Sequence, residues 1–203
     1  MKSFKLLSVI ALTVALFTSC VSRQNQGAPL TVDSVFDAIE VYNGVEVEYV
    51  PSGSVSYTVT ASEDAKSKLR MKVNGGTLSI WAEDLRSKDK IRVRLSAPEP
   101  TSFSAYNNSK LSCDAPLKTD KLVINAWNNA DVTLMGVITV AKLDLTAYNN
   151  GSVDLPEAQC ESIDIEAYNN ANVRVAGSAG KLKVSQYNNS RVNTTALKVA
   201  EIE

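Results

Sequence analysis

The chain has 203 residues with 21 basic and 22 acidic side chains, a formal net charge of −1, and no histidine. This balanced charge, without a basic stripe, argues against a nucleic-acid partner. The lack of histidine removes the commonest general base and the commonest zinc ligand. No P-loop, dinucleotide fingerprint or Gly-X-Ser-X-Gly motif is present. We therefore expect neither a cofactor nor a bound metal.

The first 19 residues have the pattern of an export signal. Lys2 and Lys5 give a positive start, and the apolar run of residues 6–17 is too short to span a membrane as a mature helix. The segment is similar to a bacterial lipoprotein signal, in which Cys20 becomes the lipidated first residue after cleavage. An ordinary secretory signal that ends near a cysteine is the alternative.

Lipid chains on Cys20 would hold the protein stably on a membrane. Residues 20–29 are polar without periodicity, which predicts a flexible tether. We expect a cell-envelope protein anchored to the outer membrane, on its periplasmic or its surface side.

Residues 30–203 are expected to form one domain, of which residues 30–100 form irregular first coils. Residues 36–41 and 45–50 alternate apolar with polar around Tyr42-Asn43-Gly44, which predicts an early coil. The elements expected next are a strand at 55–61, a short helix at 63–69, a hairpin at 71–81 and a strand at 90–95.

Residues 101–203 repeat one motif, an aromatic residue followed by two asparagines. Successive aromatic residues are 21, 21, 20 and 19 positions apart, which is typical of a solenoid with about 20 residues per coil. The candidate residues are the aromatic positions Tyr106, Trp127, Tyr148, Tyr168 and Tyr187 and the asparagines that follow them, Asn107, Asn128, Asn149, Asn169 and Asn188.

The segments on both sides of each motif alternate apolar with polar residues, as strands with one buried face do. The sequence therefore predicts an all-β fold, a parallel β-helix, and the crossover rule makes it right-handed. The last coil has Gln186 and Thr194 at buried positions, and residues 197–202 are expected to cap the open edge.

Asparagine tolerates the left-handed backbone of a sharp turn, and stacked coils would place equal positions one strand spacing apart. We expect amide ladders and an outward aromatic column along the stack. Tyrosine, tryptophan and amide groups suit a glycan or a protein ligand. A column that only stabilises the coils is the alternative, and the oligomeric state stays open.

Carboxylates are the remaining route to catalysis. Asp144 and Asp164 occupy the same outward position in successive coils, which would suit a polysaccharide-active enzyme or a calcium ion. Lys183 follows in the same column, so a solvated, charge-balanced face is the simpler interpretation, and we expect no catalytic residue. Cys113 and Cys160 are too far apart for a disulfide and are expected to be free, buried thiols.

Residues 36–41, 45–47 and 76–80, together with the strand-turn-strand repeats, resemble the head GIN domain family. Its members are secreted or lipid-anchored proteins, common in Bacteroidetes, that carry the label of auto-transporter adhesins. The resemblance implies a non-enzymatic, adhesin-like protein, although the aromatic-Asn-Asn turns replace the Gly/Ser-rich turns of many members. A glycan-active enzyme and a purely structural envelope scaffold are the alternatives.

Overall fold

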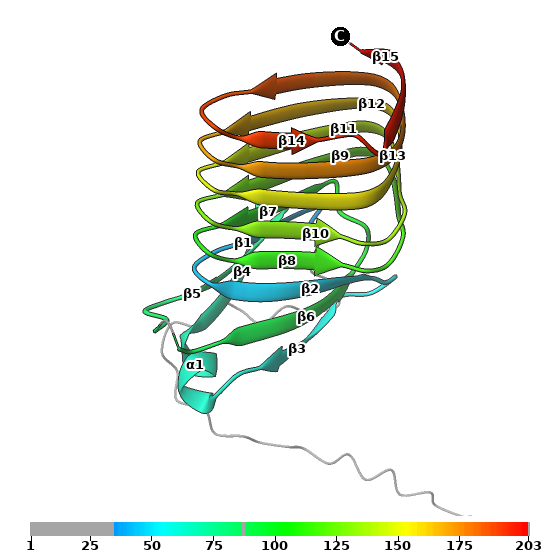
Figure 1. Cartoon of the computed structure of the whole chain (residues 1–203). Helices are drawn as coiled ribbons and strands as arrows, with labels where there is room; N and C mark the ends of the chain where they lie inside the picture. The colour runs from blue at the N-terminus through cyan, green and yellow to red at the C-terminus, as the bar shows by residue number, and fades with distance from the viewer. Residues whose placement is uncertain (1–34, 87, 203) are drawn as a thin grey trace, which may run out of the picture.

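The computed structural model describes residues 35–86 and 88–202 (Figure 1). The expected signal of residues 1–19, Cys20 and the tether of residues 20–29 lie outside the described residues. The first half contains β1 (Ala38–Val41), β2 (Val45–Pro51), β3 (Ser56–Thr60), α1 (Glu63–Lys68), β4 (Leu69–Asn74), β5 (Thr77–Ala82) and β6 (Ile91–Ala97). The second half contains β7 (Ser102–Tyr106), β8 (Lys110–Cys113), β9 (Leu117–Trp127), β10 (Asp131–Leu134), β11 (Ile138–Tyr148), β12 (Ser152–Tyr168), β13 (Asn172–Gln186), β14 (Arg191–Asn193) and β15 (Leu197–Ile202).

The strands stack into a flattened, right-handed parallel β-helix, as the sequence predicts (Figure 1). One face, called the near sheet, contains β6, β2, β8, β10 and the first parts of β12 and β13. The other face, called the far sheet, contains β5, β1, β7, β9, β11 and the second parts of β12 and β13. The two long strands β12 and β13 bend from one face to the other.

The core lies between the two sheets and is built by strict alternation. In β11, for example, Leu143, Leu145 and Ala147 are buried, while Asp144 and Thr146 between them are partly exposed. The same apolar phase recurs in every coil, so one continuous core extends from Phe36 to Leu197. Fully burying a large aliphatic side chain stabilises a fold by about 1.5–3 kcal/mol, so the core is the main stabilising element.

The coils are not stacked in chain order. The coil formed by β1 and β2 lies between the β5–β6 coil and the β7–β8 coil, because β1 pairs with both β5 and β7 and β2 pairs with both β6 and β8. The chain forms one coil, descends to build another beneath it, and then returns above the first. The short helix and the β4–β5 hairpin expected in this region are both present.

The two ends of the stack differ. At the lower end, β3 and β4 pair antiparallel with β6 and β5 and break the parallel pattern. At the upper end, β15 was expected to cap the coil. It does pair with β13, but as one more parallel strand, so among the described residues it is itself the last strand. No described helix is long and apolar enough to cross a membrane.

Candidate functional site

Each aromatic-Asn-Asn motif forms a two-residue turn from the far sheet to the near sheet. In all five motifs both asparagines have positive φ, between 49° and 61°. The turn is closed by a backbone hydrogen bond, as from the Gly151 N–H to the Tyr148 carbonyl oxygen at 3.1 Å. Consecutive positive φ values are typical of a type I′ turn, and asparagine is one of the few residues that adopts them readily. We call this side of the solenoid the turn edge.

The first asparagine of each turn belongs to a continuous amide ladder, as the sequence predicts. Each side-chain Nδ2 donates to the Oδ1 of the asparagine in the coil below. The donor–acceptor distances are 3.1 Å for Asn128 to Asn107, 3.0 Å for Asn149 to Asn128, 2.9 Å for Asn169 to Asn149 and 2.9 Å for Asn188 to Asn169. The ladder also reaches Asn43, which accepts from Asn107 at 3.3 Å.

The aromatic residues form a column of six rings, because Tyr42 joins the five expected members. The outermost pairs, Tyr42–Tyr106 and Tyr168–Tyr187, are stacked, with ring centroids 4.7 and 4.8 Å apart and interplanar angles of 12° and 10°. Flat stacking turns the ring faces toward each other and the ring edges toward solvent. In these pairs the rings therefore stabilise the stack more than they offer a face to a ligand.

The middle of the column is not stacked flat: Tyr148 and Tyr168 are inclined by 52° with ring centroids 6.0 Å apart, and Trp127 is inclined to both of its neighbours. Its ring is inclined by 67° to Tyr106 and by 42° to Tyr148, with centroid distances of 6.1 and 5.5 Å. Trp127 is 38% exposed and Tyr187, at the end of the column, is 52% exposed, whereas Tyr106, Tyr148 and Tyr168 are only partly exposed. Because neither neighbour lies flat on it, Trp127 leaves part of its ring face accessible.

Hydrogen-bonding groups border Trp127 on both sides. Asn128 follows it on the turn edge, and Asn125 precedes it on β9, beside Thr146 of β11. The Asn125 amide donates to the Ser104 hydroxyl at 3.0 Å, so its orientation is fixed. The arrangement is an apolar ring face between polar groups held in place by their neighbours.

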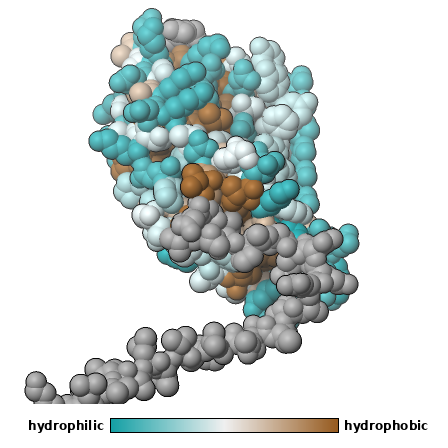
Figure 2. Space-filling model, turned by 180° about the vertical axis from the view of Figure 1, so that it is seen from behind, coloured by the Kyte–Doolittle hydropathy of each residue, from teal (hydrophilic) through white to brown (hydrophobic). Residues whose placement is uncertain are grey.

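The surface around the far sheet is mainly hydrophilic, with hydrophobic colour confined to small patches (Figure 2). Broad apolar patches mark obligate interfaces and membrane contacts, and this view shows none.

The residue after the two asparagines lies at a tight corner. The Ser109 hydroxyl donates to the Val41 carbonyl oxygen at 2.9 Å and accepts from the Tyr106 N–H at 2.9 Å. At Gly151 an added Cβ would lie 1.8 Å from the Ala126 carbonyl oxygen. The corner thus admits only small side chains, as its composition suggests.

Asp144 and Asp164 are cross-strand neighbours, as predicted from the repeat. Asp144 forms ion pairs of 3.2 Å with Lys121 and with Lys142, and Asp164 forms one of 3.0 Å with Lys183. Lysines thus balance both carboxylates, which favours a solvated polar face. Within the described ranges, no three histidine, cysteine or acidic residues lie close enough together to hold a metal ion.

The two described cysteines are free, as expected, with Cys113 buried and Cys160 half-buried. Burial raises the pKa of both thiols to about 11, so both are protonated at neutral pH. A protonated thiol is a poor nucleophile, and neither cysteine lies on the turn edge.

Sequence reasoning did not extend the ladder to Tyr42 and Asn43. The signal was present in Tyr42-Asn43-Gly44, where a glycine with φ of 75° replaces the second asparagine. The inclination of Trp127 was not foreseeable, because the sequence does not specify how neighbouring rings pack.

Comparisons with known proteins agree on the fold. Several solved structures are similar to this chain, and three of them illustrate the range. A "putative adhesin" from Parabacteroides merdae has a TM-score of 0.78 and 21% identity over 85% of this chain and 73% of that chain. A "putative lipid binding protein" from Parabacteroides distasonis has a TM-score of 0.69 and 16% identity, covering 83% and 73%. A "putative adhesin" from Bacteroides fragilis has a TM-score of 0.53 and 13% identity, covering 85% and 93%.

No functionally curated protein matches the chain. Residues 35–203 match the family described as "Putative auto-transporter adhesin, head GIN domain". This match covers most of the chain and bears out the resemblance inferred from the sequence. The chain belongs to the head GIN domain family.

Proposed function

We propose that the protein is a non-enzymatic, adhesin-like binding protein of the cell envelope that contacts a glycan through its turn edge. Family membership supports the adhesin-like role and the envelope location. The observation that carries the proposal is Trp127, a 38% exposed residue inside the column whose ring is inclined to both neighbouring rings.

The chemistry of the edge fits a sugar ring. An accessible indole face packs against the apolar C–H face of a pyranose, and the adjoining amides exchange hydrogen bonds with its hydroxyls. Each ladder asparagine uses one amide hydrogen on its neighbour, so the second amide hydrogen remains for a ligand. Because the ladder holds these amides in place, little side-chain entropy would be lost on binding.

The surroundings of the acidic residues Asp144 and Asp164 also favour a binding role over catalysis. Ion pairs with lysine occupy Asp144 and Asp164, and neither carboxylate lines any of four surface hollows formed by described residues. Catalysis by a carboxyl pair needs a site that encloses a substrate, and these partly exposed carboxylates are instead paired with lysines on a sheet face.

The test compares glycan binding of the chain from Gln24 onward with that of a double variant, Trp127→Ala with Tyr148→Ala. Tyr57→Ala, on β3 and away from the turn edge, is the matched control, and circular dichroism confirms that each protein is folded. We expect a glycan array to show binding by the parent and the control, and a clear loss in the double variant. Equal binding by all three would contradict the role of the turn edge. Binding to a protein in place of every glycan would reassign the ligand class.

Anchoring is a separate part of the proposal. We propose that a lipid on Cys20 holds the protein on the outer membrane. In cells, Cys20→Ser should shift the protein from the membrane fraction to the soluble fraction and abolish labelling by a radioactive fatty acid. Unchanged labelling of the variant would refute attachment at this residue.

A further inference from the structure

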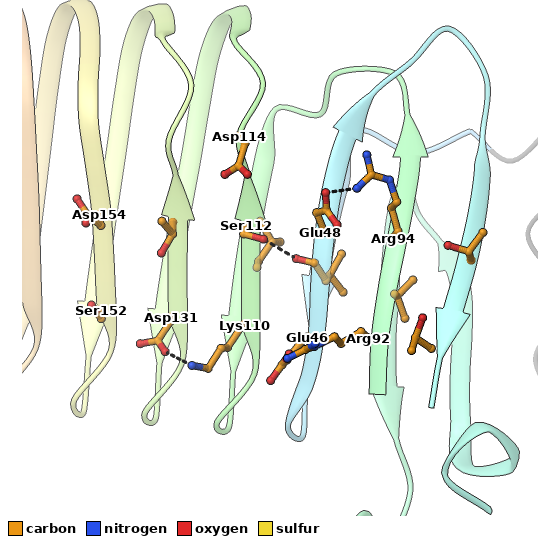
Figure 3. Close-up of a pocket in the computed structure, with 16 residues that line it drawn as sticks. Glu46, Glu48, Arg92, Arg94, Lys110, Ser112, Asp114, Asp131, Ser152 and Asp154 are labelled. Carbon is orange, nitrogen blue, oxygen red and sulfur yellow. Dashed lines mark hydrogen bonds and ion pairs between the residues drawn. The ribbon is translucent and has the colours of Figure 1, made fainter. Parts of the chain in front are cut away.

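A hollow of about 680 Å³ lies on the outer surface of the near sheet, on the opposite face from Trp127 (Figure 3). Six strands contribute to it: β3, β6, β2, β8, β10 and β12. Its volume is within the range of sites for small ligands, roughly 300–1,000 Å³. We call it the near-sheet hollow.

Differences in side-chain length create the near-sheet hollow. Its floor is formed by the short hydroxyl residues Ser112 of β8 and Thr133 of β10, which are neighbours in register. Longer ion pairs form walls beside this floor, Glu48 with Arg94 on one side and Asp154 with Arg174 on the other. Across the strands this row reads Arg94, Glu48, Ser112, Thr133, Asp154, Arg174. Beyond Arg94 the lining continues to Thr58 and Thr60 of β3.

The walls place carboxylates nearest the floor and guanidinium groups behind them. Arg174 holds Asp154 through two hydrogen bonds of 2.7 and 2.9 Å, so the carboxylate is fixed and charge-balanced from outside. Glu48 accepts one hydrogen bond from the Arg94 guanidinium group and is charge-balanced by it. Each carboxylate retains lone pairs that can accept further hydrogen bonds from the side of the floor.

A second row closes the hollow at the start of the strands, toward the turn edge. Arg92 binds Glu46 at 2.7 Å, and Lys110 binds Asp131 at 3.3 Å, next to the Ser152 hydroxyl (Figure 3). In all, the lining contains five acidic and three basic residues, so its charge is mildly negative. Acidic ligands are therefore disfavoured.

From this arrangement we infer that the near-sheet hollow binds a neutral sugar, as a site separate from the turn edge. A sugar hydroxyl can donate to Glu48 or Asp154 and accept from the Thr133 hydroxyl. The Ser112 hydroxyl donates to the Val47 carbonyl oxygen at 3.5 Å and can accept from the sugar. The hollow presents carboxylates, hydroxyls and basic groups at close spacing. This surface suits a sugar ring, because each hydroxyl of the ring can both donate and accept a hydrogen bond. A purely apolar ligand would leave these polar groups unsatisfied, which costs free energy.

The test is an NMR titration of the ¹⁵N-labelled chain from Gln24 onward, which retains the whole core. The compounds added are glucose, galactose, mannose, xylose and N-acetylglucosamine, with glucuronate and glucosamine as charged comparators. We expect at least one neutral sugar to shift the β8 and β10 amide signals saturably, with a dissociation constant on the order of 1 mM. Glucuronate should bind less than the neutral sugars.

Four variants locate the bound sugar. Ser112→Tyr fills the floor and should abolish the shifts, while Ser162→Tyr, also on an outward strand position but on the far sheet, should leave them unchanged. Glu48→Gln keeps the shape of the wall and should weaken binding about fivefold through the loss of one charge-assisted hydrogen bond. Since Trp127→Ala should leave the shifts intact, this inference and the proposed turn-edge site can fail independently.

Three results would overturn the inference. The first is no saturable shift of the β8 and β10 signals with any neutral sugar. The second is an equal response in Ser112→Tyr, which would place the sugar elsewhere. The third is binding of glucosamine alone, which would identify the near-sheet hollow as a cation site.

Discussion

Both edges of the solenoid connect one sheet to the other, but their connections differ in how strictly their length is fixed. At the turn edge each of the five aromatic-Asn-Asn motifs takes four residues from the aromatic position to the next outward position, as from Trp127 to Asp131 and from Tyr168 to Asn172. At the opposite side, which we call the return edge, the length varies. The chain takes nine residues from Cys113 to Leu122 and from Leu134 to Leu143, eight from Leu155 to Ile163 and seven from Val175 to Leu182.

The shrinking repeat of 21, 21, 20 and 19 residues therefore arises wholly at the return edge. At the turn edge each asparagine must meet the one above and the one below, so a single extra residue would break several hydrogen bonds at once. The return edge has no such continuous ladder, and it absorbs the change through a register shift between Leu155 and Ala158. Side-chain ladders thus fix the length of one edge and leave the other free to vary.

The largest expected difference in stability is between two variants, one with a residue inserted at the turn edge and one with a residue inserted at the return edge. A glycine inserted between Asn149 and Asn150 would disrupt at least three amide ladder bonds. It should lower the free energy of unfolding by about 4 kcal/mol, since each net hydrogen bond contributes about 0.5–1.5 kcal/mol. A glycine inserted after Glu157 should cost less than about 1 kcal/mol, because it only restores the longer return of the earlier coils. Urea denaturation measures both, and equal losses would remove the distinction between the edges.

A smaller effect is expected from one methyl group at the tightest corner. In Gly151→Ala the new Cβ would meet the Ala126 carbonyl oxygen at 1.8 Å, so the backbone of two coils must shift. We expect a loss of about 3 kcal/mol, at the upper end for overpacked sites. Gly53→Ala is the control, since no atom lies within 4 Å of its added Cβ. If both variants unfold at the same urea concentration, the coils do not approach each other as closely at Gly151 as the structure indicates.

Two substitutions at Asn149 separate the turn from the ladder. Asn149→Gly retains the positive φ but removes both ladder bonds, and should cost about 1–2 kcal/mol. Asn149→Ala also places alanine in the left-handed region and should cost about 1 kcal/mol more. The difference in thermal unfolding between the two variants measures the backbone contribution. An alanine variant more stable than the glycine variant would contradict a backbone contribution at this turn position.

The smallest effect at neutral pH concerns Cys113 at the start of the return edge. Burial raises its pKa in the folded state to about 11, above the value of about 8.5 in an unfolded chain. A group of this kind adds stability below the unfolded pKa and loses it as the pH rises through the folded pKa. The free energy of unfolding should therefore decline between about pH 9 and pH 11.

Cys113→Val places an apolar side chain where Leu134 and Leu155 lie in the next coils. It should be nearly neutral at pH 7 and should reduce the alkaline decline. The check is a series of chemical denaturations from neutral to alkaline pH. An unchanged decline in the variant would show that other groups, such as the buried Tyr49, whose pKa is also raised, dominate it.

The regular coils were predictable because repetition makes their register visible. Once Tyr148 is aligned with Tyr168, the pairs Asp144–Asp164 and Asp154–Arg174 follow, and the structure contains both. The alternation of Leu143, Leu145 and Ala147 likewise predicts their burial. Here each local pattern agrees with the global fold.

The stacking order of the first coils was not predictable, because β5 and β6 lack an aromatic-Asn-Asn turn between them. Without this marker, nothing local indicates that β1 lies between β5 and β7. The near-sheet hollow was hidden for a similar reason. Its floor and walls depend on the relative lengths of side chains such as Ser112 and Glu48, which lie 64 positions apart in the chain and meet only through the register.

The most direct test of the account is to replace Trp127 by the residue that the other motifs carry. Trp127→Tyr should preserve the aromatic column, so we expect the free energy of unfolding to change by less than about 1 kcal/mol. If the indole face is the recognition surface, binding of the glycan identified on the array should weaken several-fold in the same protein. Unchanged glycan binding together with a marked loss of stability would show that the column only stabilises the coils, and would contradict the account.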